Sequence, residues 1–176
     1  MKLTQIVFLG TLLYGCASTP TPPEQFLVGA VPGARATVCG TTEFKWWIST
    51  YVNVVAVDDM LAPPFQKDHW DWFGNRRISP ELRDPYCVVV PEGNRKVALL
   101  NVDLYYGGAI YYFGECSVTL DANIQYSMTS TWAGDFSSWL RRILIQETGT
   151  EDGASVCDLE QIDDDDLFEV IDKLKT

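Results

Sequence analysis

The residues best suited to chemistry are a single histidine, His69, and the acidic side chains beside it in Asp68-His69-Trp70-Asp71. A serine or cysteine nucleophile would need His69 as its general base, and no motif in the sequence places one beside it. The chain also contains no Gly-x-Ser-x-Gly motif, glycine-rich phosphate loop or His-Glu-x-x-His run. We therefore predict no catalytic residue, no cofactor and a protein that is not an enzyme.

Two acidic runs contain potential metal ligands. Asp68, His69 and Asp71 carry suitable oxygen and nitrogen donors, but solvated loop carboxylates explain this pattern more simply. The run from Asp163 to Asp166 lacks the alternating ligand spacing and central glycine of a calcium-binding loop. It suits the start of a short helix, so we predict no metal site.

Four cysteines follow Cys16 in the sequence: Cys39, Cys87, Cys116 and Cys157. An even number of cysteines in an exported chain indicates two disulfides, and these spacings are not those of a zinc site. Four cysteines allow three pairings, and the sequence alone does not choose among them. We prefer the nested pairing, which joins Cys87 to Cys116 and Cys39 to Cys157.

The longest irregular stretch, Met60 to Pro85, is rich in aromatic and charged side chains. Long loops in compact domains are often functional or disordered, and this one is too aromatic for simple disorder. Its rings either fold back as a lid over one end of the domain or form a surface for a ligand or partner. Trp46-Trp47 could belong to either arrangement. The candidate binding surface consists of Phe65, His69, Trp70, Trp72, Phe73, Arg76 and Arg77.

The elements that must position these residues begin with a predicted hairpin at Pro91-Glu92-Gly93-Asn94. One apolar run, Cys87–Val90, stops at this turn, and a second, Val97–Leu100, follows it. Proline sets φ for a turn, and the glycine or asparagine that follows can adopt the positive φ of a tight reversal. The pattern therefore predicts two paired antiparallel strands.

Further strands are predicted on both sides of that hairpin. Tyr51–Val57 is a continuous valine-rich run, which indicates a central strand, and Asp58-Asp59 ends it. Gly107-Gly108 predicts another turn, and apolar and polar residues then alternate from Cys116 to Ile124. Alternation of this kind is typical of antiparallel strands with one buried and one wetted face.

The C-terminal part of the chain is less uniform. The stretch from Ser137 to Glu147 suits a helix or a strand, and we favour a strand because the preceding strands need a partner. The acidic run followed by Leu167, Val170, Ile171 and Leu174 predicts a short amphipathic helix. Together these patterns predict a mainly-β fold, an antiparallel β-sandwich with an Ig-like or transthyretin-like meander and a short C-terminal α-helix.

The first residues have the pattern of an export signal, with Lys2 before an apolar run, Ile6 to Tyr14, that is too short to span a bilayer. The sequence Leu13-Tyr14-Gly15-Cys16 resembles the lipobox of bacterial lipoproteins, although a small or aliphatic residue is usual in place of Tyr14. The resemblance implies a signal peptide over residues 1–15 and a lipid anchor on Cys16. An ordinary secretory peptide, cleaved a few residues later, is the alternative.

Residues 16–33 are expected to form the lipidated cysteine and a tether. Pro20, Pro22 and Pro23 favour an extended, solvated chain. In Gram-negative lipoproteins, an aspartate after the lipidated cysteine commonly retains the protein at the inner membrane. Ala17 stands at that place, so the resemblance implies an outer-membrane anchor facing the periplasm. A secreted or soluble periplasmic protein is the alternative.

Composition indicates one globular domain, expected over residues 34–176. Removing 15 of the 176 residues leaves 161, and the contents of 47% hydrophobic and 21% charged residues are ordinary. Without Lys2, the chain has 12 basic against 24 acidic residues and a formal charge of −12. This balance argues against nucleic acid and against an anionic lipid surface as partners.

A second resemblance runs from Tyr51 to Tyr126. Small β-sandwich lipoproteins of unknown biochemistry have a Val-Asp-Gly step, then a strand and a Pro-Gly-Lys-His turn. Here Val57-Asp58-Asp59 and Pro91-Glu92-Gly93 take those places, and no histidine follows the turn. The similarity supports the fold and implies nothing about function.

Two functions are compatible with these patterns. The first is a non-enzymatic cell-envelope lipoprotein, an interaction or structural module that docks onto another envelope protein. The alternative is a module that binds a small ligand or a glycan, with Trp70 and Trp72 as stacking platforms. Coplanar, solvent-open rings would favour the glycan, whereas rings packed in the core would leave the first function.

Overall fold

The computed structural model describes residues 25–28, 33–45, 47–70, 76–77, 85–132, 140–150 and 154–176. The expected signal peptide, Cys16 and most of the expected tether lie outside these residues.

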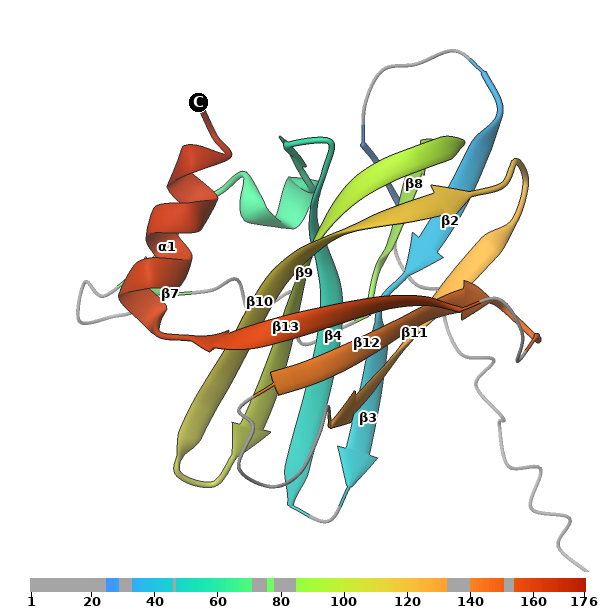
Figure 1. Cartoon of the computed structure of the whole chain (residues 1–176). Coiled ribbons are helices and arrows are strands. Elements are labelled where there is room, and N and C mark those ends of the chain that lie inside the picture. The colour runs from blue at the N-terminus through green and yellow to red at the C-terminus, as the bar shows by residue number, and fades with distance from the viewer. Residues whose placement is uncertain are drawn as a thin grey trace, which may run out of the picture.

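The described chain is mainly β, as predicted, with one large sheet, one small sheet and a C-terminal helix (Figure 1). The large sheet contains β1 (Gln25–Leu27), β2 (Arg35–Cys39), β3 (Thr41–Lys45), β4 (Ile48–Val57), β5 (Met60–Leu61), β8 (Cys87–Pro91), β9 (Gly93–Tyr105), β10 (Gly108–Leu120), β11 (Gln125–Trp132), β12 (Leu140–Glu147) and β13 (Ser155–Ile162). The small sheet pairs β6 (His69–Trp70) with β7 (Arg76–Arg77). A short 3₁₀ helix, η1 (Pro63–Phe65), precedes β6.

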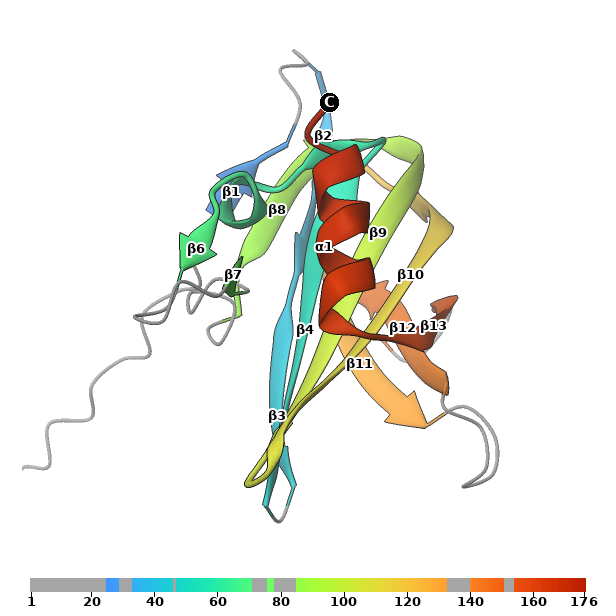
Figure 2. The same ribbon diagram turned by 90° about the vertical axis from the view of Figure 1, so that its left-hand side faces the viewer.

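The large sheet is mixed and curled rather than a clear antiparallel sandwich. Its strand order is β1-β8-β2-β11-β12-β13-β10-β9-β4-β3, with β5 added beside β4. Two pairs, β1 with β8 and β2 with β11, run parallel. The sheet curls so far that β11 also contacts β3 and β4, which stand at the other end of the order (Figures 1 and 2). The apolar core lies inside this curl.

Gly40 allows β2 to pass directly into β3 although the two strands have different neighbours. β2 pairs with β8 and β11, whereas β3 pairs with β4. A Cβ atom at Gly40 would lie 2.6 Å from the carbonyl oxygen of Val52 and 3.2 Å from that of Tyr86. Only glycine fits where these backbones approach so closely.

The predicted hairpin at Pro91–Asn94 is wrong. β8 pairs with β1 and β2, whereas β9 pairs with β4 and β10, so the chain turns a corner between two parts of the sheet. The Arg95 Nε donates to the carbonyl oxygens of Pro91 and Glu92, at 3.2 and 3.1 Å. Its Nη1 donates to Asp58 at 3.0 Å. These bonds hold a bend in which Gly93 adopts a φ of 103°.

Other local predictions are confirmed. Tyr105 and Gly108 face each other across a two-residue connection, so the chain reverses at the predicted glycines. β4 has neighbours on both sides and Val52–Val57 are buried throughout, although the strand stands next to the end of the sheet order rather than at its centre. In β10, Val118 and Leu120 are buried and the intervening Thr119 is exposed. The alternating pattern therefore identified the buried face of this strand.

Both C-terminal predictions agree with the described residues. Residues 140–147 form the strand β12, while 137–139 lie outside the description. The helix α1 spans Asp164–Lys173, and Asp163 caps it by accepting a 2.9 Å hydrogen bond from the backbone N–H of Asp166. Leu167 and Ile171 are buried, so this face of α1 belongs to the core.

Two disulfides are present, as predicted, but the preferred nested pairing is wrong. Cys39 bonds to Cys87 and Cys116 bonds to Cys157, with Cα–Cα distances of 4.0 and 5.6 Å. Cys39 and Cys87 are direct partners across β2 and β8. The other bridge joins the neighbouring strands β10 and β13. The nested pairing would need Cys87 of β8 beside Cys116 of β10, but β8 lies beside β1 and β2, and β10 lies beside β9 and β13.

Candidate functional site

The structure separates the residues of the predicted binding surface. Phe65, on η1, is 4% exposed and belongs to the core, whereas Trp70 is 63% exposed. His69 and Trp70 pair with Arg77 and Arg76 across β6 and β7. Trp72 and Phe73 lie outside the described residues. Phe65 therefore contributes to stability. Among the described tryptophan and phenylalanine residues of this surface, Trp70 is the exposed one.

Arg76 is held inside an ion network between β7 and α1. Its guanidinium donates two hydrogen bonds to Asp172, at 2.7 and 2.6 Å, and two to Asp68, at 3.0 and 2.6 Å. The guanidinium carbon lies 4.7 Å from the centre of the Phe168 ring. Lys175 adds a 2.7 Å bond to Asp68. The network binds the small sheet to the C-terminal helix.

The charges of this network shift the pKa values of its members in the expected directions. Hydrogen bonds from Arg76 lower the pKa of Asp172 to about 2. The pKa of Asp68 falls below its ordinary value through hydrogen bonds from Lys175 and then Arg76. The Arg76 pKa rises, chiefly through its bonds to Asp172. Arg76 therefore serves the fold, and its charge is neutralised within the chain.

A second aromatic surface lies at the tips of two neighbouring hairpins. We call it the hairpin end and define it as Phe44, Trp47, Tyr105 and Tyr106. Phe44 and Trp47 are 73% and 72% exposed, Tyr105 is 41% exposed and Tyr106 is fully exposed. The tips are adjacent because Ser49 of β4 pairs with Leu104 of β9. Figures 1 and 2 show both tips at the end of the sheet opposite the C-terminus.

The chain around the hairpin end contains few charges. No acidic or basic residue occurs from Leu104 to Gly114, and Phe44 to Val57 contains only Lys45. The protein as a whole is 21% charged, with a net charge of −11. The hairpin end is therefore an apolar, charge-poor region on an acidic protein.

A buried ion pair, Asp103 with Arg141, crosses the interior of the curl. The two residues are 4% and 6% exposed and are joined by a hydrogen bond from Arg141 Nη2 to Asp103 Oδ2. Thr50 and Asn101 donate to Asp103 at 2.8 and 3.2 Å, and Ser130 donates to Asn101 at 2.7 Å. These bonds connect β4, β9, β11 and β12.

Aromatic rings enclose the Arg141 guanidinium. Its central carbon lies 3.5 Å from the ring centre of Trp132 and 5.5 Å from that of Tyr112. Burial, followed by the nearby charge of Asp103, raises the pKa of the Tyr112 hydroxyl. Each acidic or basic group here already faces an opposite charge or a ring. We interpret the cluster as packing that aligns four strands.

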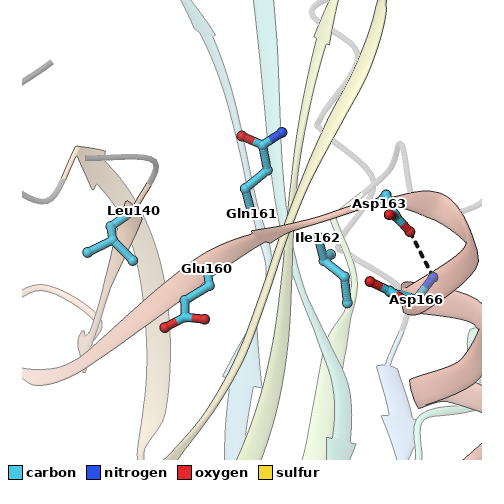
Figure 3. A pocket seen from close by; sticks show the side chains of 6 residues that line it. All are labelled: Leu140, Glu160, Gln161, Ile162, Asp163 and Asp166. Carbon is cyan, nitrogen blue, oxygen red and sulfur yellow. Dashed lines mark hydrogen bonds between the residues drawn. The ribbon is translucent and has the colours of Figure 1, made fainter. Parts of the chain in front are cut away.

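A hollow beside β13 and the start of α1 is lined by Leu140, Glu160, Gln161, Ile162, Asp163 and Asp166. Figure 3 shows that these side chains do not converge: Glu160 and Gln161 project to opposite sides of β13. Asp163 is occupied in capping α1. Among the described residues, no group of three or more histidine, cysteine, aspartate or glutamate side chains could hold a metal ion.

Sequence reasoning did not identify the hairpin end as a surface. The sequence pattern does not place Trp46-Trp47 on either arrangement, and Trp46 lies outside the described residues. The uncharged run from Leu104 to Gly114, with Tyr-Tyr before the turn glycines, was the available signal. This run forms a surface only because the β9–β10 tip lies beside the β3–β4 tip, which the sequence alone does not show.

Comparisons with protein-family models, curated proteins and solved structures give no match for this chain. Within the part of the chain that the structure describes, no helix has the length and hydrophobicity needed to cross a bilayer.

Proposed function

We propose that this protein is a lipid-anchored component of the cell envelope, attached through Cys16 to the outer membrane and facing the periplasm. Its β domain acts there as a non-enzymatic interaction or structural module. The main supporting observation is that all four cysteines after Cys16 pair in two disulfides. Structural disulfides persist in oxidising compartments such as the periplasm and are rare in the cytosol.

The N-terminal sequence supports the anchor. Leu13-Tyr14-Gly15-Cys16 ends an apolar run in the manner of a lipobox, and three prolines follow within residues 17–24. A lipidated cysteine followed by an extended tether would keep the β domain within reach of the membrane.

Exposed aromatic residues support an interaction role. Trp70 and the hairpin end present large rings to solvent, and aromatic residues dominate binding energy where a surface is used. A glycan-binding module remains the second candidate, because Trp70 is open enough to stack on a sugar. Its expected companion, Trp72, lies outside the described residues.

Acyl labelling tests the anchor. We expect the wild-type chain, expressed in a Gram-negative host, to incorporate labelled palmitate and to enter the detergent phase on phase separation. Cys16→Ser should lose both properties, whereas Ser18→Ala, a control two residues away, should keep them. An unlabelled wild-type protein, or a Cys16→Ser protein that still carries the label, would contradict the lipoprotein assignment.

Co-purification tests the interaction role. If the β6–β7 region binds a partner, the double change Trp70→Ala with Trp72→Ala should remove that partner from detergent-solubilised membranes without lowering the melting temperature. Binding of the wild type and of the same double variant to an immobilised glycan array distinguishes the glycan-binding module from the protein-interaction module. A wild-type chain that binds sugars and loses this binding on substitution would favour the glycan module.

A further inference from the structure

We infer that the hairpin end contacts the lipid bilayer itself, with Phe44, Trp47, Tyr105 and Tyr106 at the headgroup level of a zwitterionic leaflet. The β domain then touches the membrane at two places, the lipid on Cys16 and its own aromatic tips. This inference rests on the proposed lipid anchor, and it adds the part of the domain that faces the membrane.

The residue types and their exposure point to a membrane interface. Tryptophan and tyrosine have an apolar ring with a polar group, and they are enriched where hydrocarbon meets water. Here four aromatic side chains, three of them more than 70% exposed, gather on two adjacent tips. Contiguous exposed apolar patches on soluble domains mark binding or membrane surfaces.

The charge distribution favours a zwitterionic bilayer over an anionic one. A net charge of −11, to which the acidic N-terminus of α1 at Asp163–Asp166 contributes, would repel an anionic membrane. Leu104–Gly114, which forms the β9–β10 tip, contains no charge at all. Insertion of this tip at the headgroup level therefore carries no penalty for removing charges from water.

The geometry of the N-terminal strand allows the anchor and the tips to reach one plane. Gln25 pairs with Cys87, which pairs with Cys39, so β1 begins level with the end of β2. β1 runs opposite to β2, so the chain enters β1 from the side of the hairpin end.

The chain before β1 is long enough for the anchor to reach the plane of the tips. The tip at Lys45 lies six residues beyond Cys39, which is about 20 Å of strand. The nine residues from Cys16 to Gln25 span up to about 30 Å when extended. A lipid on Cys16 can therefore enter the same leaflet that the hairpin end contacts. A protein partner at the hairpin end is the competing occupant, and nothing in the tether geometry favours it.

Fluorescence quenching by brominated lipid tests the contact. The full lipidated protein is reconstituted into phosphatidylcholine vesicles whose acyl chains carry bromine close to the headgroups. We expect brominated vesicles to quench part of the tryptophan emission. Trp47→Phe should lower the quenched fraction, because it removes a tryptophan at the membrane. Trp70→Phe should raise that fraction, because it removes an exposed tryptophan that is distant from the membrane.

The two variants are matched, since both remove one exposed indole and should keep the wild-type melting temperature. No quenching of the wild type, or an equal change in both variants, would overturn the inference. A Trp47 that is shielded from an aqueous quencher in native membranes but not in pure lipid vesicles would also overturn the inference. That result would assign the hairpin end to a protein partner. Acyl labelling distinguishes these results from failure of the anchor: a labelled protein without quenching contradicts only the tip contact.

Discussion

Arg76 and Asp172, 96 positions apart in the sequence, form two hydrogen bonds of 2.7 and 2.6 Å between guanidinium and carboxylate. Arg76 also contacts Asp68, at 2.6 Å, so one guanidinium bridges two carboxylates. This fork joins a short strand in the middle of the chain to the last helix. It places Arg76, one of the predicted binding residues, in an ion network within the chain.

The first prediction concerns acid titration of this fork. The pKa of Asp172 in the fold is about 2, below its ordinary value of 3.8. A depressed folded-state pKa means that the stabilisation is present above the unfolded value and disappears as the pH falls through about 2. An NMR titration of the Asp172 carboxyl should give this low midpoint, and Arg76→Gln should raise it toward the ordinary value, with Lys175 retaining a smaller lowering effect.

The neighbouring arginine provides the control for that titration. Arg77→Gln should leave the Asp172 midpoint low, because Arg77 is not among the causes of the shift. Asp172 is 52% exposed, so the effect on overall stability should be small. A midpoint near 3.8 in the wild type would show that the fork does not form in solution.

The second prediction concerns the buried pair of Asp103 and Arg141. Arg141→Met should lower the free energy of unfolding by roughly 3–5 kcal/mol, because it leaves a buried carboxylate without its counter-charge. Arg142→Met, which breaks the exposed pair with Asp158, should cost about 0–1 kcal/mol. Urea denaturation measures both values. Equal losses in the two variants would mean that the Asp103–Arg141 pair is hydrated rather than buried.

The third prediction concerns the disulfide pairing. Non-reducing peptide mapping should recover Cys39 linked to Cys87 and Cys116 linked to Cys157, with no free thiol in the denatured, unreduced protein. The bridges span 48 and 41 positions. Loss of either one should reduce the free energy of unfolding by about 4 kcal/mol through the entropy of the unfolded chain. A peptide that links Cys87 to Cys116 would contradict this pairing, and four free thiols would contradict export as well.

The fourth prediction separates core from surface in the aromatic stretch. Phe65→Ala should cost roughly 3–5 kcal/mol, because it removes a ring packed in the core. Trp70→Ala should change stability by no more than about 0.5 kcal/mol, because most of its ring faces solvent. Thermal melting of the two variants checks both. A large loss of stability in Trp70→Ala would mean that this ring is packed in the core. Trp70 would then no longer be a candidate binding residue.

Features that depend on neighbouring residues could be predicted from the sequence. The C-terminal helix follows from its acidic start and the spacing of Leu167 and Ile171. The reversal before Gly108 and the buried face of β10 follow from glycine placement and period-two alternation. An even number of cysteines after Cys16 was sufficient to predict two bridges, since that argument needs no geometry.

Tertiary structure alone decided which strands became neighbours. The residues of the Pro91–Asn94 bend are compatible with a reversal or a corner, and Arg95 with distant Asp58 selected the corner. Once β8 paired with β2, Cys39 faced Cys87, so the cysteine pairing followed from strand order.

The functional surfaces were decided in the same way. Phe65 and Trp70 lie five positions apart in the same irregular stretch, yet one packs in the core and the other faces solvent. The hairpin end exists because β4 and β9 lie side by side and bring two separate tips together. The composition of each tip is local information, but strand adjacency depends on contacts between residues far apart in the chain.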